Sequence, residues 1–411
     1  MHNTGSASVP WTIDEAADGI TAPAGFRAAG VACGIKAAQL DLALIAADGP
    51  ASAAGLFTTN KVQAAPVLLS RAHLERSGGA ARAIVINSGC ANACTGVAGF
   101  EVARRTAEHA AGLFGCRVEE VLVASTGVIG VALELEKVSR GVAAAAAVLG
   151  RDRHHDAARA IMTTDPWPKE AAVRIQTPAG SFSVGGMAKG SGMIEPMLAT
   201  MLAFLTTDAR VAPLLLRRSL AAAVRDTFNA ITVDGECSTN DSVVALAGGA
   251  SGVDIDEALA PALEAGLRAV SRELALSIVR GGEGATKVMA IRVVGARERA
   301  HAERAARVVA NSPLVKTAVH GGDPNWGRLI AAAGRAGVPF DLTRAAVTIG
   351  GTVLFSNGEP HDEAAPIAAA YLKKAEIDIE IDLGTGGTHQ ATVWTCDLSA
   401  EYVRINADYR T

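Results

Sequence analysis

The sequence has no marked excess of charge of either sign. Its 411 residues include 38 lysines and arginines and 42 aspartates and glutamates, which gives a formal net charge of −4 at pH 7. Proteins that hold nucleic acid or an anionic membrane by electrostatic attraction usually carry a clear positive excess. The charge balance therefore argues against both as partners of this chain.

Long apolar runs and a secretory leader are absent as well. The most apolar stretches, such as the alanine-rich residues 138–150, are interrupted, and a membrane-spanning helix needs about 20 consecutive apolar residues. Residues 1–30 do not pass from a basic segment to an apolar one, as a secretory signal would. We therefore expect no membrane span and a cytoplasmic location.

The six cysteines show no C-x-x-C spacing. Cys90 and Cys94 stand four residues apart, but no second pair and no histidine cluster completes a zinc site. In a chain of this length, such cysteines are typical of reduced cytosolic thiols rather than of a disulfide framework. We expect no metal ion or organic cofactor, and we predict that Cys90 and Cys94 are small buried residues in a tight turn.

Aromatic residues are scarce, at 4% of the chain, whereas hydrophobic residues make up 49%. This composition is typical of an α/β protein in which small residues allow close backbone contacts. The length exceeds that of one ordinary core and predicts two lobes. Strand-like segments such as 40–47 and 81–89 alternate with helix-like segments such as 99–115 and 208–231. We therefore predict a layered α/β or α+β fold in which helices pack on sheets.

A threonine–glycine pair lies in Ser125–Gly130, STGVIG, at the end of a predicted strand. Backbone N–H groups in a glycine-containing turn can converge on one oxygen and form an oxyanion hole, as those of Thr126 and Gly127 would. Thr–Gly turns are common, so an ordinary turn is the alternative at this position.

The segment Lys189–Leu202, KGSGMIEPMLATML, begins with a lysine among glycines and ends in an apolar run that contains Thr200. A threonine hydroxyl is an effective nucleophile when a base lies close, and the α-amine of an N-terminal threonine is such a base. That arrangement requires cleavage of the bond between Ala199 and Thr200. The flexible glycines and the rigid Pro196 suit a strained loop. From this segment alone, a buried and inert Thr200 is the alternative.

Two further polar segments contain residues suited to ligands. Glu283 stands among glycines in Gly281–Lys287, GGEGATK, where its carboxylate would meet a cation closely. The segment does not match the phosphate-binding pattern GxxxxGK[ST], and a glutamate would repel phosphate. Asp323–Gly327, DPNWG, fits a turn with a packed tryptophan as well as it fits a ligand site.

Together these segments resemble the ornithine acetyltransferases, also called glutamate N-acetyltransferases, of cyclic arginine biosynthesis. The matching pieces occur in family order over nearly the whole chain and include GFRAAGVACGIK, NSGCANACTG, STGVIG, IMTTD, GGMAKGSGMI, ATML, GGEGATK, SPLVKTAVHGGDPNWGR and YVRINADYRT. The resemblance implies an autoprocessed enzyme with an N-terminal nucleophile. Cleavage between Ala199 and Thr200 would give an α chain, 1–199, and a β chain, 200–411. The resemblance also implies a heterotetramer of two α and two β chains.

The resemblance assigns roles to individual residues. Thr200 corresponds to the nucleophile that accepts the acetyl group, and the backbone at Thr126 and Gly127 corresponds to the oxyanion hole. The substrate-binding positions correspond to Thr163, Lys189, Thr200, Glu283, Asn406 and Thr411. Thr163 is a better match than its neighbour Thr164.

The implied reaction moves an acetyl group from N2-acetyl-L-ornithine to L-glutamate through an acetyl-Thr200 ester, which gives ornithine and N-acetylglutamate. Lys189 would pair with a substrate carboxylate and Glu283 with the δ-ammonium group. Whether acetyl-CoA is also a substrate stays open. The alternatives are an acetyltransferase of secondary metabolism, an amidohydrolase or aminopeptidase in which water resolves the acyl-enzyme, and an uncleaved binding protein.

The chain departs from the family pattern near the predicted cleavage site. The family often has His and Asn around Pro196, where this chain has Glu195 and Met197, and Pro166 stands where Thr is frequent. Because these positions lie beside the predicted site, the changes would affect substrate preference rather than remove the nucleophile.

Overall fold

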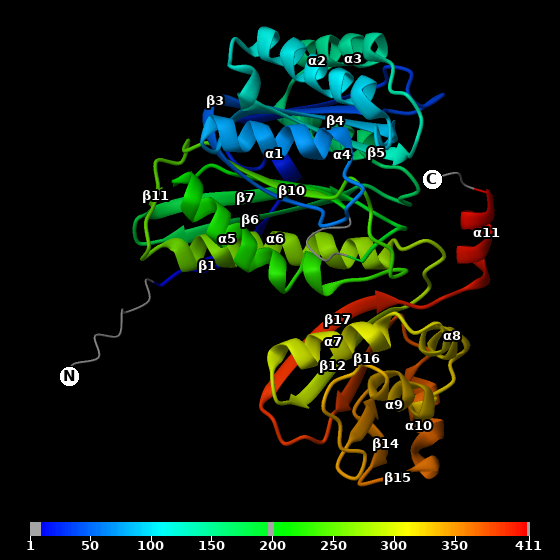
Figure 1. Cartoon of the computed structure of the whole chain (residues 1–411). Coiled ribbons are helices and arrows are strands. Elements are labelled where there is room, and N and C mark those ends of the chain that lie inside the picture. Colours follow the sequence, from blue (N-terminus) through cyan, green and yellow to red (C-terminus); the bar gives the residue numbers. More distant parts are fainter. Residues whose placement is uncertain (1–9, 196–200, 409–411) are drawn as a thin grey trace.

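The computed structural model describes residues 10–195 and 201–408. They form two lobes, each with its own sheet and its own hydrophobic core (Figure 1). No helix in these ranges is long and apolar enough to cross a membrane. The predicted fold class, helices packed on sheets in two lobes, is confirmed.

A nine-stranded mixed sheet forms the large lobe. In spatial order its strands are β1 (Thr12–Ala16), β6 (Lys169–Thr177), β7 (Gly180–Lys189), β8 (Leu202–Thr207), β10 (Ser242–Ala247), β3 (Leu42–Phe57), β4 (Ala80–Cys90) and β5 (Val121–Val128), with β2 (Phe26–Val31) paired beside β3. The β8–β10 and β4–β5 pairs are parallel, and the other pairs are antiparallel. Two short strands, β9 (Arg210–Val211) and β11 (Asp254–Ile255), pair separately.

Helices cover this sheet on both faces. They are α1 (Ala65–Ser77), α2 (Gly96–Phe114), α3 (Leu135–Ala147), α4 (His154–Ala160), α5 (Pro213–Arg225) and α6 (Ala260–Arg280). Successive side chains of β3 point to opposite faces, as in any strand. Leu42 and Leu44 pack with residues of α1–α3, whereas Ala43 and Ile45 pack with residues of α4.

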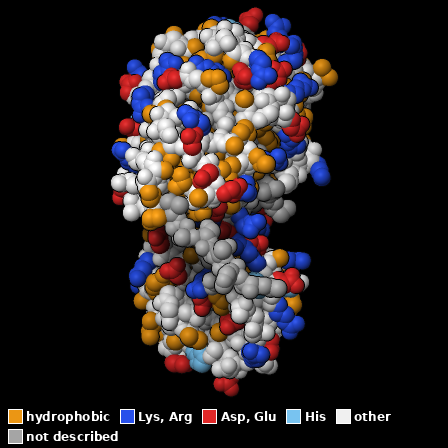
Figure 2. Space-filling view, turned by 90° about the vertical axis from the view of Figure 1, so that its left-hand side faces the viewer, with side chains coloured by type: hydrophobic (Ala, Val, Ile, Leu, Met, Phe, Trp, Pro, Cys, Tyr) orange, Lys and Arg blue, Asp and Glu red, His pale blue; other side chains and the backbone are white. Residues whose placement is uncertain are grey.

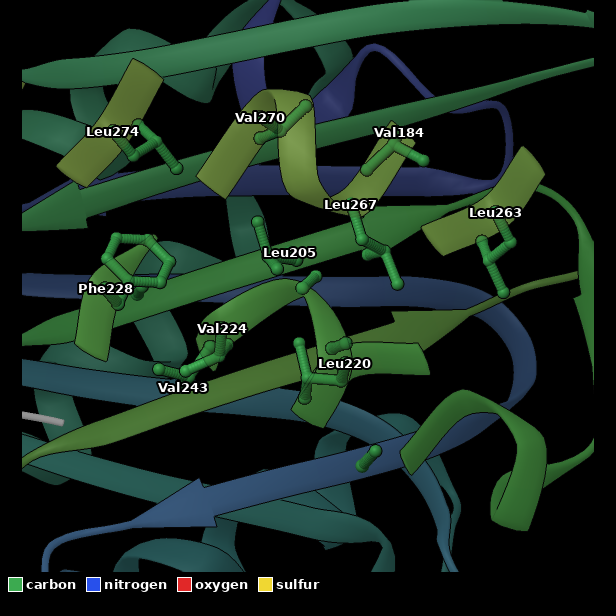
Figure 3. Close-up of a cluster of buried hydrophobic side chains, with 14 of the residues drawn as sticks. Val184, Leu205, Leu220, Val224, Phe228, Val243, Leu263, Leu267, Val270 and Leu274 are labelled. Atoms are coloured by element: carbon green, nitrogen blue, oxygen red, sulfur yellow. The ribbon is translucent and has the colours of Figure 1, made fainter. Parts of the chain in front are cut away.

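The core beneath α5 and α6 holds the central strands in place (Figure 3). The labelled side chains from the strands are Val184, Leu205 and Val243, and those from the helices and the turn after α5 are Leu220, Val224, Phe228, Leu263, Leu267, Val270 and Leu274. All ten are buried, and burying a side chain of this size contributes roughly 1.5–3 kcal/mol. This packing fixes β7, β8 and β10, which carry the pocket described below.

A six-stranded sheet forms the small lobe, drawn in yellow to red at the bottom of Figure 1. Its strands are β15 (Glu359–Pro360), β14 (Thr352–Ser356), β13 (Ala346–Ile349), β16 (Glu376–Asp382), β12 (Val288–Ala296) and β17 (His389–Cys396), in spatial order. Its helices are α7 (Arg299–Ala310), α8 (Pro313–Gly321), α9 (Trp326–Gly334) and α10 (Ala365–Tyr371). The C-terminal helix α11 (Ala400–Asp408) follows β17 and returns toward the large lobe (Figure 1).

Two predicted helices had different outcomes. The helix predicted to stop at Gly115 is confirmed, since α2 ends one residue earlier and Gly115 has a left-handed φ of 61°. The single helix predicted over 208–231 is wrong. Pro213 begins the helix because its fixed φ suits a first turn, and it favours extended backbone in the residue before it. The flanking segments form β9 and a short 3-10 helix, η4 (Phe228–Ala230).

The predicted cleavage point lies between two neighbouring strands of one sheet. β7 ends at Lys189 and β8 begins at Leu202, and these two residues are antiparallel partners. Strands β8 and β10 of the predicted β chain therefore lie between strands of the predicted α chain in the large sheet. The lobes separate near residue 288, where β12 begins. The division into chains 1–199 and 200–411 stays a prediction.

Candidate active site

One pocket collects predicted site residues from both predicted chains, and its volume is about 130 Å³. Its lining includes Thr126, Gly127, Thr163, Thr164, Lys189, Glu283 and Asn406, which are all of the predicted site residues that the structure describes. Met201 and Leu202, which follow Thr200 in the sequence, line the pocket as well. Ala199, Thr200 and Thr411 lie outside the described residues.

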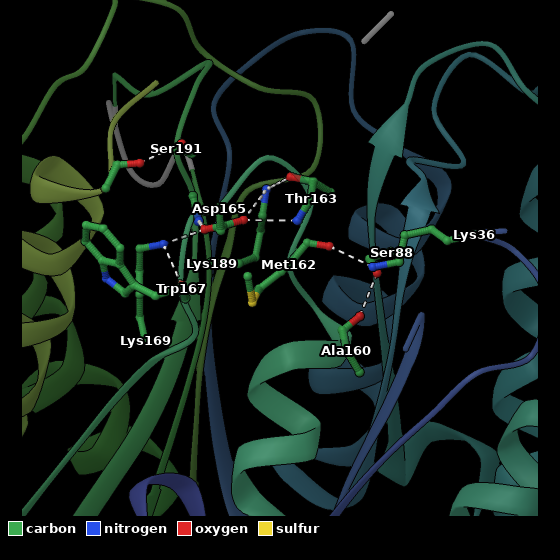
Figure 4. A network of polar contacts seen from close by, with 12 residues as sticks. Lys36, Ser88, Ala160, Met162, Thr163, Asp165, Trp167, Lys169, Lys189 and Ser191 are labelled. Carbon is green, nitrogen blue, oxygen red and sulfur yellow. Dashed lines mark hydrogen bonds and ion pairs between the residues drawn. The ribbon is translucent and has the colours of Figure 1, made fainter. Parts of the chain in front are cut away.

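Lys189 is a largely buried cation at the end of β7. Its side chain is 10% exposed, and Nζ donates a hydrogen bond of 2.7 Å to Thr163 Oγ1. Nζ also lies 3.9 Å from a carboxylate oxygen of Asp165 (Figure 4). Since Thr164 has no such contact among the described residues, the geometry agrees with the better match of Thr163.

Asp165 organises the residues around Lys189. Its carboxylate accepts hydrogen bonds from Lys169 Nζ at 2.6 Å, from the Gly190 N–H at 2.7 Å and from the Thr163 N–H at 3.0 Å. Burial by itself raises the pKa of Asp165, but Lys189 and Lys169 outweigh it and lower that pKa to about 2. Asp165 is therefore a carboxylate at neutral pH and keeps two lysines in place.

The backbone that leads to Thr163 is fixed by two further side chains. Lys36 Nζ donates to the carbonyl oxygen of Met162 at 3.0 Å, and Ser88 Oγ donates to that of Ala160 at 2.6 Å (Figure 4). Burial lowers the pKa of Lys36. Asp165, Lys36 and Ser88 each lie in a motif that resembles the family, but none was predicted as a site residue, because the motifs do not reveal which side chains support Thr163 and Lys189.

Gly127 lies where a side chain would not fit. Its φ is 127°, and a Cβ atom there would lie 2.6 Å from the backbone nitrogen of Cys90 on β4. The turn predicted at 125–130 is wrong in its first half, since β5 continues to Val128, with a register irregularity opposite Cys90. This irregularity interrupts the regular pleat where Thr126 and Gly127 line the pocket.

Glu283 presents a buried carboxylate to the pocket. Only 7% of the residue is exposed, and its Oε2 accepts a hydrogen bond of 2.7 Å from Asn406 Nδ2 on α11. Within the described ranges no cation pairs with Glu283. A Cβ atom at Gly192 would lie 2.7 Å from Oε1, so glycine is needed there for the carboxylate to approach the backbone. The predicted cation partner of Glu283 is therefore not a side chain of the described residues.

Asp234 holds the segment just before the predicted cleavage point. Its carboxylate accepts hydrogen bonds from the Met193 N–H at 2.7 Å and the Ile194 N–H at 2.8 Å, and the Tyr402 hydroxyl donates to it at 3.2 Å. Met193 has a φ of 57°, which is uncommon for a residue other than glycine. Burial and the negative charge of Asp234 raise the pKa of Tyr402. Asp234 thus stabilises a strained backbone. No sequence motif around Asp234 predicted this role.

Asp241 is a second buried carboxyl group in the pocket wall. It is 2% exposed, and its Oδ2 has no hydrogen-bond partner in the part of the chain that the structure describes. Burial raises the pKa of Asp241 well above its ordinary value. The next residue, Ser242, donates its N–H to the carbonyl oxygen of Met201 at 3.0 Å. Asp241 therefore lies beside the start of β8.

Glu195 does not line the pocket. Its carboxylate accepts a hydrogen bond from Asn311 and lies 3.9 Å from Arg307 Nη1. Both partners belong to the small lobe, in α7 or directly after it. Met197 lies outside the described residues. That Glu195 affects substrate preference stays a prediction, and its side chain contacts Thr232 as well as the small lobe.

The remaining sequence predictions had mixed outcomes. Cys90 is buried as predicted, but Cys94 is exposed, with a φ of 57°, so its predicted burial is wrong. No group of three or more His, Cys, Asp or Glu side chains suited to a metal occurs in residues 10–195 and 201–408. Trp326 packs by stacking on Phe355, with ring centroids 4.9 Å apart, which agrees with a turn carrying a packed tryptophan.

A mixed α/β fold with a small pocket in which hydroxyl, ammonium, carboxylate and amide groups converge is typical of an enzyme site for a small charged molecule. The chain belongs to the ArgJ family, whose sequence profile matches residues 27–411. The predicted family and the prediction that the chain is an enzyme are therefore confirmed.

Sequence similarity to relatives covers nearly the whole chain. The arginine biosynthesis bifunctional protein ArgJ of Chlorobaculum tepidum is 48% identical over 404 residues, which cover 98% of this chain and 100% of that protein. The protein of the same name from Symbiobacterium thermophilum is 49% identical over 403 residues, 96% of this chain and 99% of that protein.

Two solved structures also resemble parts of the chain. The arginine biosynthesis bifunctional protein argJ of Bacillus halodurans is 35% identical with a TM-score of 0.43, covering 45% of this chain and 97% of that chain. Ornithine acetyltransferase from Mycobacterium tuberculosis, complexed with ornithine, is 46% identical with a TM-score of 0.42, covering 46% of this chain and 100% of that chain. Because both TM-scores are low, the family assignment rests on the sequence comparisons.

Proposed function

We propose that this protein is a glutamate N-acetyltransferase that moves the acetyl group of N2-acetyl-L-ornithine to L-glutamate. The observation that carries the proposal is the pocket itself. Two buried side chains of opposite charge, Lys189 and Glu283, line it together with the backbone at Thr126 and Gly127 and the residues that follow Thr200. The named relatives in arginine biosynthesis and the ornithine-bound relative support this reaction.

The two charged side chains match the charges of the acetyl donor. N2-acetylornithine carries an α-carboxylate, which suits Lys189, and a δ-ammonium group, which suits Glu283. Both side chains are largely withdrawn from water, so each attracts an opposite charge more strongly than an exposed group would. Thr163 and Asn406 position these two groups through the hydrogen bonds described above.

The proposed chemistry proceeds in two acyl transfers. Thr200 Oγ attacks the acetyl carbonyl, and the α-amine of Thr200 takes the hydroxyl proton. The negative oxygen that forms is stabilised by N–H groups at Thr126 and Gly127. The C–N bond to ornithine then breaks, the proton passes to the leaving amine, and an acetyl ester of Thr200 remains. The amine of glutamate attacks this ester, which releases N-acetylglutamate and restores the hydroxyl.

The free α-amine of Thr200 requires cleavage after Ala199. The strained backbone at Met193, held by Asp234, supports this part of the proposal, since stored strain near a scissile bond favours reaction. The resulting chains would be 1–199 and 200–411, and they would assemble as two α and two β chains in the cytoplasm. The remaining part of the proposal is that acetyl-CoA serves as a second acetyl donor. The word bifunctional in the relatives' names suggests this second activity.

One experiment separates the proposal from its rivals. The purified protein is examined on a denaturing gel and then incubated with N2-acetylornithine, with and without glutamate. We expect two fragments of similar size, and N-acetylglutamate only when glutamate is present. Equal release of acetate in both reactions, without N-acetylglutamate, would identify an amidohydrolase instead. A single intact band, together with no transfer, would indicate a binding protein. Thr200→Ala should abolish both cleavage and transfer.

A further inference from the structure

A groove rich in arginine separates the two lobes, away from the catalytic pocket. Its volume is about 780 Å³, within the range of small-molecule sites, about 300–1,000 Å³. The end of α5, η4 and α6 form one wall, and α7, β12 and β17 form the other (Figure 1). Figure 2 shows lysine and arginine side chains at the waist where the lobes meet.

The groove has a strong excess of positive charge. Its lining includes seven arginines, namely Arg225, Arg268, Arg272, Arg292, Arg299, Arg304 and Arg307. Only two carboxylates, Asp226 and Glu303, line it with them. The whole chain carries a net charge of −4, so this concentration of one sign is a local property of the groove rather than a reflection of composition.

Some of these arginines already have acidic partners. Asp226 pairs with both Arg268 and Arg299, and Arg292 pairs with Glu380 at 2.9 Å. Arg268 also pairs with Glu264 at 2.5 Å, and Arg299 also pairs with Glu303 at 2.7 Å. The charges of Arg268, Arg292 and Arg299 are therefore compensated, and the excess positive charge of the groove comes from its other arginines.

Three other arginines have no ion pair with a carboxylate in the described part of the chain: Arg225, Arg272 and Arg304. The guanidinium of Arg272 lies over the ring of Trp394, 4.9 Å from its centroid, and this stacking orients it within the groove. Planar guanidinium groups bind phosphate and carboxylate oxygens through two hydrogen bonds at once. The uncompensated arginines therefore suit a ligand with clustered negative oxygens.

Arg307 connects the groove to the catalytic pocket. Its Nη2 donates to the carbonyl oxygen of Asn229 at 2.5 Å, whereas the buried Nη1 has no hydrogen-bond partner among the described residues. Burial lowers the pKa of Arg307, against the opposing effect of the nearby Glu195 and Glu303 carboxylates. Nη1 lies 3.9 Å from Oε1 of Glu195, and Ile194 next to it lines the catalytic pocket.

We propose that this groove binds a small polyanion, a phosphate ester or a polycarboxylate, and that its binding at Arg307 alters acetyl transfer through Glu195. An anion near Arg307 competes with Glu195 for the same guanidinium. Glu195 then keeps only its hydrogen bonds from Asn311 and Thr232, and the segment that leads to the pocket changes its position or its freedom. The coupling is reciprocal, so a substrate in the pocket changes the affinity of the groove for the anion by the same factor.

Calorimetric titration of the full protein tests the binding site directly. Pyrophosphate and citrate serve as probes of the two ligand classes, at constant ionic strength with chloride as the reference anion. We expect one of the two to bind, with an affinity that falls as salt rises. The double variant Arg225→Gln/Arg304→Gln removes two exposed arginines without ion pairs and should weaken binding at least tenfold.

The matched control is Arg76→Gln/Arg105→Gln, which removes the same charge from exposed positions on α1 and α2. It should bind like the parent. Equal affinities of the groove variant and the control, or no binding of either probe at millimolar concentration, would overturn the site.

The coupling is measured by adding the probe that binds in the calorimeter to the acetyl-transfer assay. This second experiment rests on the proposed function. We expect a changed KM for N2-acetylornithine in the parent and an unchanged one in the groove variant. A probe that binds in the calorimeter but leaves KM and kcat unchanged would overturn the coupling. A protein that binds the probe but shows no transfer at all would refute the proposed function and leave the binding site standing.

Discussion

Asn406 Nδ2 on the C-terminal helix donates a hydrogen bond of 2.7 Å to Glu283 Oε2, joining residues 123 positions apart. Asn406 also donates to the carbonyl oxygen of Tyr402 at 3.0 Å, which fixes its side chain on α11. An amide orients a carboxylate without neutralising it. The contact therefore orients the Glu283 carboxylate at the pocket without pairing it with a cation.

The first prediction concerns the charge of Glu283. Glu283→Gln should raise KM for N2-acetylornithine by about tenfold or more, because a charge-assisted hydrogen bond to the δ-ammonium contributes about 1.5–3 kcal/mol. Glutamate lacks this ammonium group and carries an additional carboxylate, so its KM should stay unchanged or fall. Steady-state kinetics with each substrate varied in turn makes the distinction. Glu236→Gln, an exposed carboxylate of the same pocket, is the control. Equal losses for both substrates would contradict the assignment.

The second prediction concerns Lys189. Donor and acceptor both carry an α-carboxylate, so Lys189→Met should raise KM for both substrates, in contrast to Glu283→Gln. The exposed Lys61→Met should leave both values unchanged. An effect on one substrate alone would show that Lys189 binds a group that the two do not share.

Lys189→Met should also change the acid stability of the protein. The pKa of Asp165 is lowered to about 2 in the folded protein, partly by Lys189. A lowered pKa contributes stability that is present above the unfolded value, near 3.8, and is lost as pH falls toward 2. Removing Lys189 raises the pKa of Asp165, so acid unfolding should begin at a higher pH. Circular dichroism during acid titration measures this shift, and an unchanged midpoint would contradict it.

The third prediction uses two glycines of one segment. Gly127→Ala should abolish transfer, because its Cβ would collide with the backbone of β4 and displace the Thr126–Gly127 N–H groups. Gly130→Ala is the matched control, since its φ of 78° is also positive but no atom lies within 4 Å of its Cβ. The control should cost about 1 kcal/mol of stability and retain transfer. Full activity in Gly127→Ala would exclude this backbone from the oxyanion site.

The fourth prediction concerns the buried carboxyl of Asp241. Its raised pKa means that its stabilising contribution is complete below the unfolded value of about 3.8 and is lost as pH rises toward the folded value. Asp241→Asn should therefore gain stability over the parent as pH rises above 4, by about 1.4 kcal/mol per pH unit within that window. Denaturant unfolding at several pH values measures the difference. Asp152→Asn, whose side chain is 81% exposed, should show no such trend, and a flat difference for Asp241→Asn would refute the raised pKa.

The main elements of the fold were predictable because they depend on local patterns. The strands at 40–47 and 81–89 and the helix that ends at Gly115 follow from apolar periodicity and a terminal glycine. The helix predicted over 208–231 failed where Pro213 limits its start, a signal that the apolar pattern concealed. Apolar periodicity thus predicted where helices and strands occur better than it predicted the residues at which they begin and end.

The site was predictable mainly through the family resemblance. Each of Thr126, Lys189 and Glu283 lies in a common type of segment, and only their occurrence in family order indicated that they meet. Asp234 escaped prediction because its function depends on backbone N–H groups of another segment, and such contacts leave no pattern in the sequence. Asp165 lies in the motif IMTTD, but its contact with Gly190 joins it to a segment 25 residues away. Asp234 and Met193, for example, are 41 residues apart.

The last prediction concerns cleavage. Asp234 accepts two backbone N–H groups and so stabilises the left-handed conformation of Met193. If this strain promotes the break between Ala199 and Thr200, Asp234→Ala should slow fragment formation by at least tenfold, and Asp234→Asn, which keeps one acceptor oxygen, should lie between it and the parent. Timed samples of freshly expressed protein on a denaturing gel give the rates.

Two controls distinguish strain from misfolding. Glu236→Gln changes a neighbouring carboxylate that also lines the pocket and should cleave at the parental rate. Thermal unfolding of uncleaved Asp234→Ala in the Thr200→Ala background, compared with Thr200→Ala alone, reports whether the fold survives. A folded Asp234→Ala variant that cleaves as fast as the parent would show that Asp234 orders the pocket without storing strain for the reaction. Slow cleavage in a folded variant would connect Asp234, which holds the backbone at Met193 and Ile194, to the chemistry at Thr200.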